Sequence, residues 1–245
     1  MTRRSGAVRI FLYNWPVYSF TWTLALATVA LSRFVPAFAA WPIAIGACVA
    51  LAWSFASLLV SFYVYDASAL VSGSWVAKLI ETSMPWATIH AGLDAEVELD
   101  AVMRGQCVAR LDIFDPQIMT SPSITRARSV TPQAHEALRC SPRALALGDE
   151  TCSAIVVAFT AHEIRDQRAR EAFFCELHRA LRPGGKALIV EHLRDFANFV
   201  SFGPGYLHFV SRSEWLRLAA HANFAIASET RVTPWVMALT LERRP

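Results

Sequence analysis

The sequence predicts an α/β domain with a doubly wound, largely parallel sheet, preceded by a hydrophobic helical hairpin. Two stretches near the N-terminus, 10–32 and 34–65, contain no Asp, Glu, Lys or Arg. From residue 84 onward, short apolar runs alternate with segments of helical period, a pattern typical of parallel strands covered by helices. Residues 176–191 show the pattern most clearly. Pro183 stops a helix, Gly184 permits the positive φ of a tight turn, and a buried strand follows.

The N-terminal stretches predict a transmembrane helical hairpin over residues 1–65. The chain of 245 residues is 54% hydrophobic, with a mean hydropathy of +0.34, and this excess is concentrated before residue 66. Each stretch exceeds the roughly 20 residues that a spanning helix needs, and only Arg33 separates them. Arg3, Arg4 and Arg9 precede the first span, so the positive-inside rule places the N-terminus in the cytoplasm. Two spans return the chain to that side. We therefore expect an integral protein of a bacterial-type inner membrane with its α/β domain in the cytoplasm.

Two further expectations concern this N-terminal part. Ala37-Phe-Ala39 resembles a signal-peptide cleavage site, and even after cleavage the second span would keep the chain in the membrane. The small residues Gly46, Ala47 and Ala50 permit close helix packing and hence a homodimer. Residues 66–83 are apolar to a lesser degree and predict an interfacial linker helix that leads into a domain over 84–245.

Cysteines and charge exclude several function classes. The five cysteines form no C-x-x-C pair, which argues against a disulfide framework and against a zinc site, so no metal is expected. The net charge is +3, and the basic residues are scattered without interleaved aromatic residues. A nucleic-acid partner is therefore not indicated.

Seven strands and three clear helices make up the expected domain. The last two strands follow each other without a helix, which predicts an antiparallel hairpin at the C-terminus. The expected strands are 86–90, 107–111, 137–140, 153–159, 186–191, 224–229 and 235–241, and the expected helices are 95–103, 168–181 and 212–221.

The segment Arg179-Ala-Leu-Arg-Pro-Gly-Gly185 and the strand after it resemble the late α/β segment of class I S-adenosylmethionine (SAM)-dependent methyltransferases. The C-terminal hairpin is a second similarity. The resemblance implies a Rossmann-like, doubly wound seven-stranded sheet and SAM as the cofactor. Ligands of such sheets bind outside the carboxyl ends of the strands.

The resemblance places a cofactor loop after the first strand. Thr88-Ile-His-Ala-Gly-Leu-Asp94 lies where the family carries a glycine-rich motif. Gly92 matches the central glycine, while His90 and Asp94 replace the outer two. Asp94 also suits a helix N-cap, so a purely structural turn is an open alternative.

Further strand ends supply the remaining cofactor contacts that the resemblance implies. Asp112, followed by Ile113, matches the acid that accepts hydrogen bonds from the ribose hydroxyls, a task that suits an acceptor-only carboxylate. Ser141 stands where the family often has an acid near the adenine. Phe159, at the end of the fourth strand, would face the transferable methyl group. Asp115, before Pro116, is the second candidate for the ribose acid, or opens a turn.

Catalytic and substrate candidates follow the fourth and fifth strands. His162, His192 and His208 are candidate bases because imidazole titrates near neutrality. The candidate substrate contacts are Glu163, Asp195, Phe202 and Tyr206. We expect the aromatic residues around 199–209 to form a lid over an apolar substrate, and the alternative is that they form ordinary core. For His162 the alternative is that it merely caps a helix start.

These observations predict SAM-dependent methyl transfer to a lipophilic or membrane-associated small-molecule acceptor, because a tethered domain meets lipid-soluble compounds at high effective concentration. The alternative is a degenerate methyltransferase fold that has lost SAM and acts as a membrane-anchored scaffold. A short-chain reductase is disfavoured, since the sequence has neither G-x-G-x-x-G nor Y-x-x-x-K.

Overall fold

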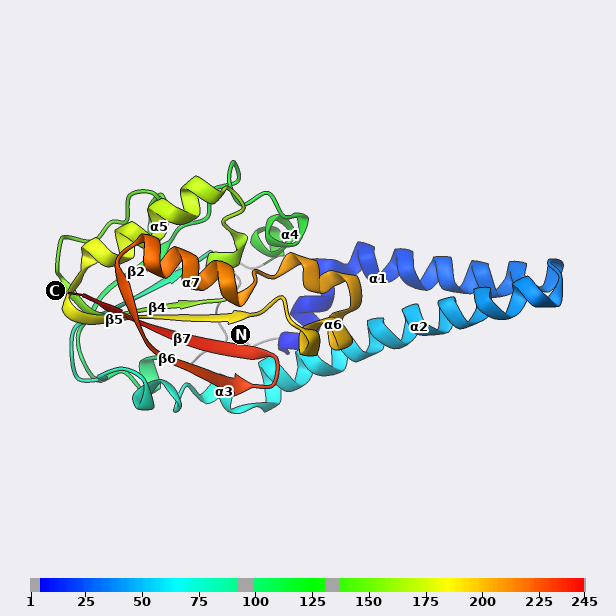
Figure 1. The fold of residues 1–245 in the computed structure, drawn as a ribbon, viewed down its shortest axis with the longest axis horizontal. Helices are drawn as coiled ribbons and strands as arrows, with labels where there is room; N and C mark the ends of the chain where they lie inside the picture. Colours follow the sequence, from blue (N-terminus) through cyan, green and yellow to red (C-terminus); the bar gives the residue numbers. More distant parts are fainter. Residues whose placement is uncertain (1–4, 92–98, 131–136, 245) are drawn as a thin grey trace.

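A long helical hairpin projects from an α/β domain (Figure 1). The computed structural model describes residues 5–91, 99–130 and 137–244. The hairpin consists of α1 (Gly6–Leu31) and α2 (Ala37–Phe62), joined by the 3-10 turn η1 (Ser32–Phe34). The predicted pair of helices is therefore present. By length and composition, however, one helix of the described chain could cross a membrane, Ala37–Ser72, and α1 does not meet the same criterion.

The domain contains a seven-stranded sheet in the order β3-β2-β1-β4-β5-β7-β6. The first five strands pair in parallel, and β7 runs antiparallel to both β5 and β6. The strand bounds are β1 (Trp86–His90), β2 (Cys107–Asp112), β3 (Leu138–Arg139), β4 (Cys152–Ala158), β5 (Leu181–His192), β6 (Phe224–Thr233) and β7 (Val236–Arg243). This is the predicted Rossmann-like sheet with a C-terminal antiparallel hairpin.

Helices α5 (Gln167–Ala180) and α7 (Arg212–His221) cover one face of the sheet (Figure 1). Both begin with a side-chain cap: Asp166 accepts from the backbone of Ala169, and Ser211 accepts from the backbone of Glu214. The apolar side chains of α5 and α7, such as Phe174 and Trp215, form the larger core with the strands. The helix α4 (Pro122–Val130) lies against the side of α1.

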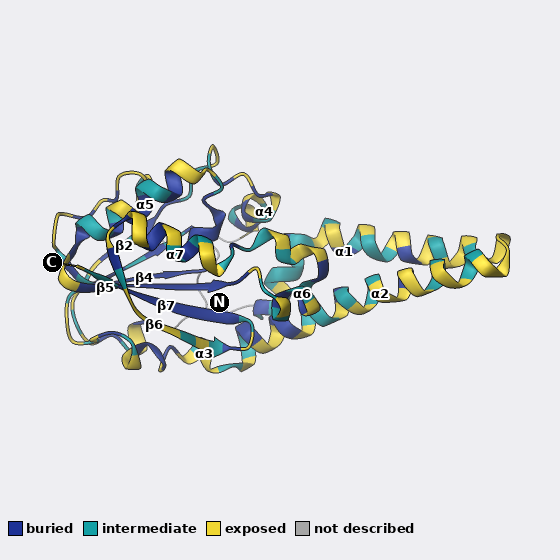
Figure 2. Ribbon diagram, in the orientation of Figure 1, coloured by how far each residue is buried: buried dark blue, intermediate teal, exposed yellow. Residues whose placement is uncertain are grey.

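The other sheet face forms a second core with the base of the hairpin. Val64 and Tyr65, which follow α2, pack in one cluster with Val156 of β4 and Leu188 of β5. The outer part of the hairpin lies away from the domain and is largely exposed, as Figure 2 shows. The hairpin thus packs against the domain at its base, while its outer part is exposed.

The segment between hairpin and sheet differs from the predicted linker helix. It contains a π-helical turn, η2 (Tyr63–Ala67), the short helix α3 (Ala69–Ser72) and the 3-10 turn η3 (Val76–Lys78). Gly73 ends α3 in the left-handed region at φ 64°, so a single helix is broken there. The predicted helix 95–103 lies partly outside the described residues, and the described part forms the 3-10 turn η4 (Leu99–Ala101).

Candidate functional site

A cavity of about 1060 Å³ lies between the hairpin and the carboxyl ends of β4 and β5. Tyr13 and Trp53 line it from the hairpin, and Arg126 lines it from α4. Phe159 and His192, at the ends of β4 and β5, line its inner part. Six of the predicted site residues share this cavity: Phe159, His162, Glu163, His192, Phe202 and His208.

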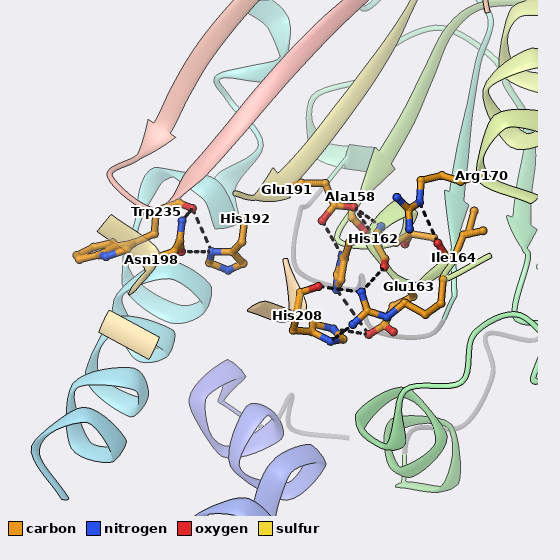
Figure 3. Close-up of polar contacts among 12 residues, drawn as sticks. Ala158, His162, Glu163, Ile164, Arg170, Glu191, His192, Asn198, His208 and Trp235 are labelled. Atoms are coloured by element: carbon orange, nitrogen blue, oxygen red, sulfur yellow. Dashed lines mark hydrogen bonds and ion pairs between the residues drawn. The ribbon is translucent and has the colours of Figure 1, made fainter. Parts of the chain in front are cut away.

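His162 lies between two buried carboxylates (Figure 3). Its Nδ1 is 2.7 Å from Oε2 of Glu191, and its Nε2 is 3.5 Å from Oε1 of Glu163. Burial alone would lower the pKa of His162, but the two carboxylates raise it to about 10. At neutral pH the ring is therefore an imidazolium that donates to both acids. It is not the free base that the sequence suggested.

His208 joins this network through its contacts with Arg165 and Glu163. Arg165 donates from its guanidinium to Nδ1 of His208 at 2.6 Å, so Nε2 carries the proton and points to Oε1 of Glu163 at 3.3 Å. Burial would raise the pKa of Glu163, but its hydrogen bonds with His162 and His208 hold it well below its usual range. Oε2 of Glu163 is buried and has no hydrogen-bond partner among the described residues. Glu163 lines the cavity, but this oxygen is itself buried, so a donor from a ligand would reach it only after a small local shift.

The same residues have the donor types of a metal centre. His162, Glu163 and His208 offer ligand atoms within 4.8 Å of one another. A metal on Nε2 of His208 would require the proton on Nδ1, yet that atom already accepts from Arg165, which only donates. A second cation beside this guanidinium would also be repelled. The contacts favour a network of imidazoles and carboxylates over a metal site.

His192 differs from the other two histidines because it is held as a neutral ring. Its Nδ1 lies 3.1 Å from Oδ1 of Asn198 and 3.1 Å from the carbonyl oxygen of Trp235, so Nδ1 carries the proton. Its Nε2 then accepts from the hydroxyl of Tyr65 at 2.9 Å. Burial lowers the pKa of His192 to about 4. This ring has the protonation state that a general base needs at pH 7.

Three of the predicted cofactor residues, His90, Asp112 and Ile113, lie at the ends of β1 and β2, outside the described lining of the cavity. His90 ends β1 beside Asp112, its partner in the register. Oδ1 of Asp112 accepts from the backbone of Phe114 at 3.1 Å, and Oδ2 pairs with Arg128 at 2.7 Å. Ile113 is buried beside them. Gly92 and Asp94 lie outside the described residues.

Other predicted contacts have structural roles. Ser141 accepts from the backbone of Arg143 in an exposed turn. Asp195 caps α6 (Phe196–Phe202) and pairs with Arg231 at 2.6 Å. Tyr206 packs its ring on Phe199. Asp115 accepts from the backbone of Gln117, which is the turn that the sequence allowed as an alternative.

The sequence did not identify Tyr65, Arg165 or Glu191 as site residues. Glu191 left a recognisable signal, since it is an acid at the carboxyl end of an otherwise apolar strand. Arg165 gave only a weak signal, as one of several charged residues after β4. Tyr65 gave none, because tyrosine at the end of an apolar span is expected as an interfacial anchor.

Residues 99–189 match the methyltransferase domain family. Three solved structures resemble the chain over most of its length. A SAM-dependent methyltransferase from Aquifex aeolicus shares 18% identity at a TM-score of 0.51, covering 78% of this chain and 98% of that one. A protein from Pyrococcus horikoshii shares 14% identity at a TM-score of 0.52, covering 75% and 96%. The fold is that of the SAM-dependent methyltransferases.

A third structure agrees with this assignment of the fold. It is described as a possible histamine N-methyltransferase from Thermotoga maritima, and it shares 14% identity at a TM-score of 0.50, covering 78% of this chain and 98% of that one. No curated protein matches the sequence.

The strand ends of this methyltransferase fold can be tested against the cofactor. Asp112 has the acceptor-only chemistry that a ribose diol requires, and each of its oxygens keeps a second lone pair. It is nevertheless only 1% exposed, and Arg128 covers one of its oxygens. Phe159, directly after β4, lies in the left-handed region at φ 49°, where a bulky residue signals a constrained turn. The residue types therefore fit SAM. A ribose hydroxyl would have to share the Asp112 carboxylate with Arg128 or displace Arg128 from it.

Proposed function

We propose that this protein is a membrane-anchored methyltransferase that transfers a methyl group from SAM to a lipophilic small molecule. The methyltransferase domain match and the fold together indicate SAM as the cofactor. The acceptor class is inferred from one observation, the cavity, because an apolar hairpin and the strand ends together form its wall.

The hairpin supports the membrane part of the proposal. Helix Ala37–Ser72 is long and apolar enough to span a bilayer. Both helices of the hairpin expose large apolar side chains, a surface that monomeric soluble proteins rarely show. These side chains include Val17, Phe20, Leu24, Leu26, Phe34, Phe38, Trp41, Ile45 and Leu59. We place the N-terminus and the α/β domain on the cytoplasmic side, following the arginines that precede α1.

The cavity supplies a route from this hairpin to the reaction centre. Val17 and Thr21 of α1 and Ala50 of α2 line its outer part, whereas Phe159 and His162 line its inner part. An acceptor dissolved in the membrane would enter between the helices and reach the end of β4 without crossing water. The exposed surface of the lining is mainly apolar, as for other small-molecule sites, although polar side chains such as those of Ser57, Arg126 and His162 also line it.

SAM, when bound, supplies a methyl group already activated by the sulfonium charge, so the protein's task is orientation, exclusion of water and removal of a proton. Asp112 and Phe159 would hold the cofactor at the strand ends. The Glu163 oxygen that has no partner among the described residues would orient a donor group of the acceptor. His192 is the candidate base because its ring is neutral.

One observation favours the rival function, a scaffold without SAM. Arg128 forms an ion pair with one oxygen of Asp112, and this is the carboxylate that the ribose contact requires. If that pair is permanent, the fold binds no cofactor at this strand end.

Calorimetry with SAM and S-adenosylhomocysteine on the full chain in detergent micelles separates the two functions. We expect binding by the wild type and its loss in Asp112→Ala. A folded wild type that binds neither compound would support the scaffold.

A cavity-blocking pair tests the acceptor route. Ala50 lines the cavity, whereas Ala52 of the same helix is exposed. With radiolabelled SAM and a total bacterial lipid extract, Ala50→Trp should lose most lipid labelling while Ala52→Trp keeps it. Equal labelling by both variants would reject the route between the helices.

A further inference from the structure

The base of the hairpin holds Tyr65 in a fixed position. The residue lies in the π-helical turn Tyr63–Ala67, a local geometry found often at functional sites. Asp66 fastens the start of α1 to this turn, because its carboxylate accepts from the backbone of Gly6 at 2.7 Å and of Ala7 at 3.0 Å. Gly6 packs directly on Tyr65, and a Cβ at position 6 would lie 2.3 Å from that of Tyr65.

The hydroxyl of Tyr65 has a defined direction. Asn198 donates from its amide nitrogen to Asp195 and to the carbonyl of Trp235, so its Oδ1 faces His192. That contact keeps the His192 proton on Nδ1, and the lone pair of Nε2 can only accept. The Tyr65 hydroxyl therefore donates to His192. In any further contact the Tyr65 oxygen is then an acceptor.

Tyr65 and His192 lie beside the expected position of the methyl group. Both line the cavity, together with Phe159 at the end of β4. The rings of Tyr65 and Phe159 are 5.3 Å apart, and those of Phe159 and His192 are 5.5 Å apart. Tyr65 is thus a polar group at the inner end of a mostly apolar cavity, contributed by a segment outside the matched residues 99–189.

We infer that the hairpin completes the active site, with Tyr65 as a catalytic residue that takes the proton from a hydroxyl-bearing lipophilic acceptor, such as a phenol or enol. This inference rests on the proposed methyl transfer. The acceptor oxygen gains the methyl group as the S–CH3 bond breaks, and the sulfur keeps the electron pair and becomes neutral. The acceptor proton passes to the Tyr65 oxygen, while the Tyr65 proton passes to Nε2 of His192. The positive charge of the sulfonium thereby ends on His192, which releases its proton afterwards.

This proton transfer through Tyr65 to His192 also defines the acceptor class. A neutral amine attacks through its own lone pair and needs no base beforehand, whereas a phenol or enol must lose its proton as the bond forms. The pair Tyr65–His192 would have no task with an acceptor that carries no acidic hydrogen.

Tyr65→Phe tests the inference, with Tyr63→Phe as the matched control. Tyr63 lies in the same turn but is 45% exposed and packs on Trp235. The assay is transfer of label from SAM to a total bacterial lipid extract in detergent micelles, with S-adenosylhomocysteine binding measured in parallel. Loss of a positioned proton acceptor should lower the labelling rate of Tyr65→Phe by roughly 100-fold or more. Its binding of S-adenosylhomocysteine should stay within about twofold, and Tyr63→Phe should match the wild type.

Each other outcome overturns a distinct claim. A Tyr65→Phe variant as active as the wild type would remove Tyr65 from the reaction and leave methyl transfer intact. Parallel loss of labelling and of cofactor binding would make Tyr65 a structural residue. A wild type that binds no cofactor and labels no lipid would overturn the proposed function, and with it the role of Tyr65.

Discussion

Nδ1 of His162 lies 2.7 Å from Oε2 of Glu191, and this contact joins the end of β4 to the end of β5. The other oxygen of Glu191 accepts from the backbone of Thr160 at 3.1 Å and of His162 at 3.2 Å. One buried carboxylate therefore shapes the turn after β4 and keeps an imidazolium in the cavity wall. Removal of one partner would leave the other charge buried without compensation.

Glu191→Gln should lower the free energy of unfolding by about 3 kcal/mol, the usual result of breaking a buried ion pair. Thermal unfolding of the full chain in micelles measures the change. Glu229→Gln is the matched control, because Glu229 pairs with Arg212 at the surface of the domain and such pairs contribute little. Equal effects of the two variants would show that the His162–Glu191 contact is energetically unimportant.

His162 predicts a loss of stability at alkaline pH. Its pKa is about 10 in the folded chain, against 6.5 for the free side chain, so the folded state binds the proton more tightly. The stabilisation is complete below pH 6.5 and disappears as pH rises through 10. Over this range the wild type should lose roughly 4 kcal/mol more than His162→Gln. Parallel pH profiles of the two proteins would contradict the raised pKa.

His192 predicts the opposite dependence in acid. Its pKa falls from 6.5 to about 4 on burial, so the unfolded chain binds the proton more tightly. Stability is retained above pH 6.5 and decreases as pH falls toward 4, by roughly 3 kcal/mol for this group. His192→Gln should flatten the acid limb of unfolding curves measured between pH 4 and 7. An unchanged acid limb would mean that burial does not lower the pKa of His192 in the folded protein.

The sequence predicted elements whose signals are local. The bounds of β1 and α7 agree with the expected 86–90 and 212–221, because apolar periodicity and a side-chain cap at Ser211 act within a few residues. The strand β5 begins earlier than expected, at Leu181, since that residue pairs with Cys152 across the sheet. The tight turn at Pro183 is still present, with Gly184 at φ 75°.

The contacts that define the site are long-range, and the sequence could not reveal them. Tyr65 and His192 are 127 positions apart, and only the return of the hairpin to the strand ends brings them together. Similarly, the sequence singled out three histidines as equivalent candidates for a base. Their protonation differs because Glu191 lies beside His162, whereas two carbonyl oxygens lie beside His192.

Arg128→Ala should strengthen cofactor binding if Asp112 contacts the ribose. In the wild type the carboxylate pairs with Arg128 at 2.7 Å, and a ribose hydroxyl must compete with that contact. Calorimetry with S-adenosylhomocysteine should show a several-fold lower Kd for Arg128→Ala, while Arg126→Ala, on the same helix, gives no such gain. A higher Kd for Arg128→Ala would instead place the guanidinium among the groups that hold the cofactor.

Gly6→Ala tests how far the reaction rate depends on the position of the hairpin base relative to the strand ends. A Cβ at this position would lie 2.3 Å from the Cβ of Tyr65, so the turn or α1 must shift. A displacement of about 1 Å can cost 100-fold in rate when it misaligns a reacting group, and lipid labelling should fall accordingly. Gly46→Ala is the control, since nothing lies within 4 Å of a Cβ there, and its better helix propensity should stabilise α2 by up to about 1 kcal/mol. If Gly6→Ala lost stability but kept its labelling rate, the base of the hairpin would support the fold without positioning the catalytic hydroxyl.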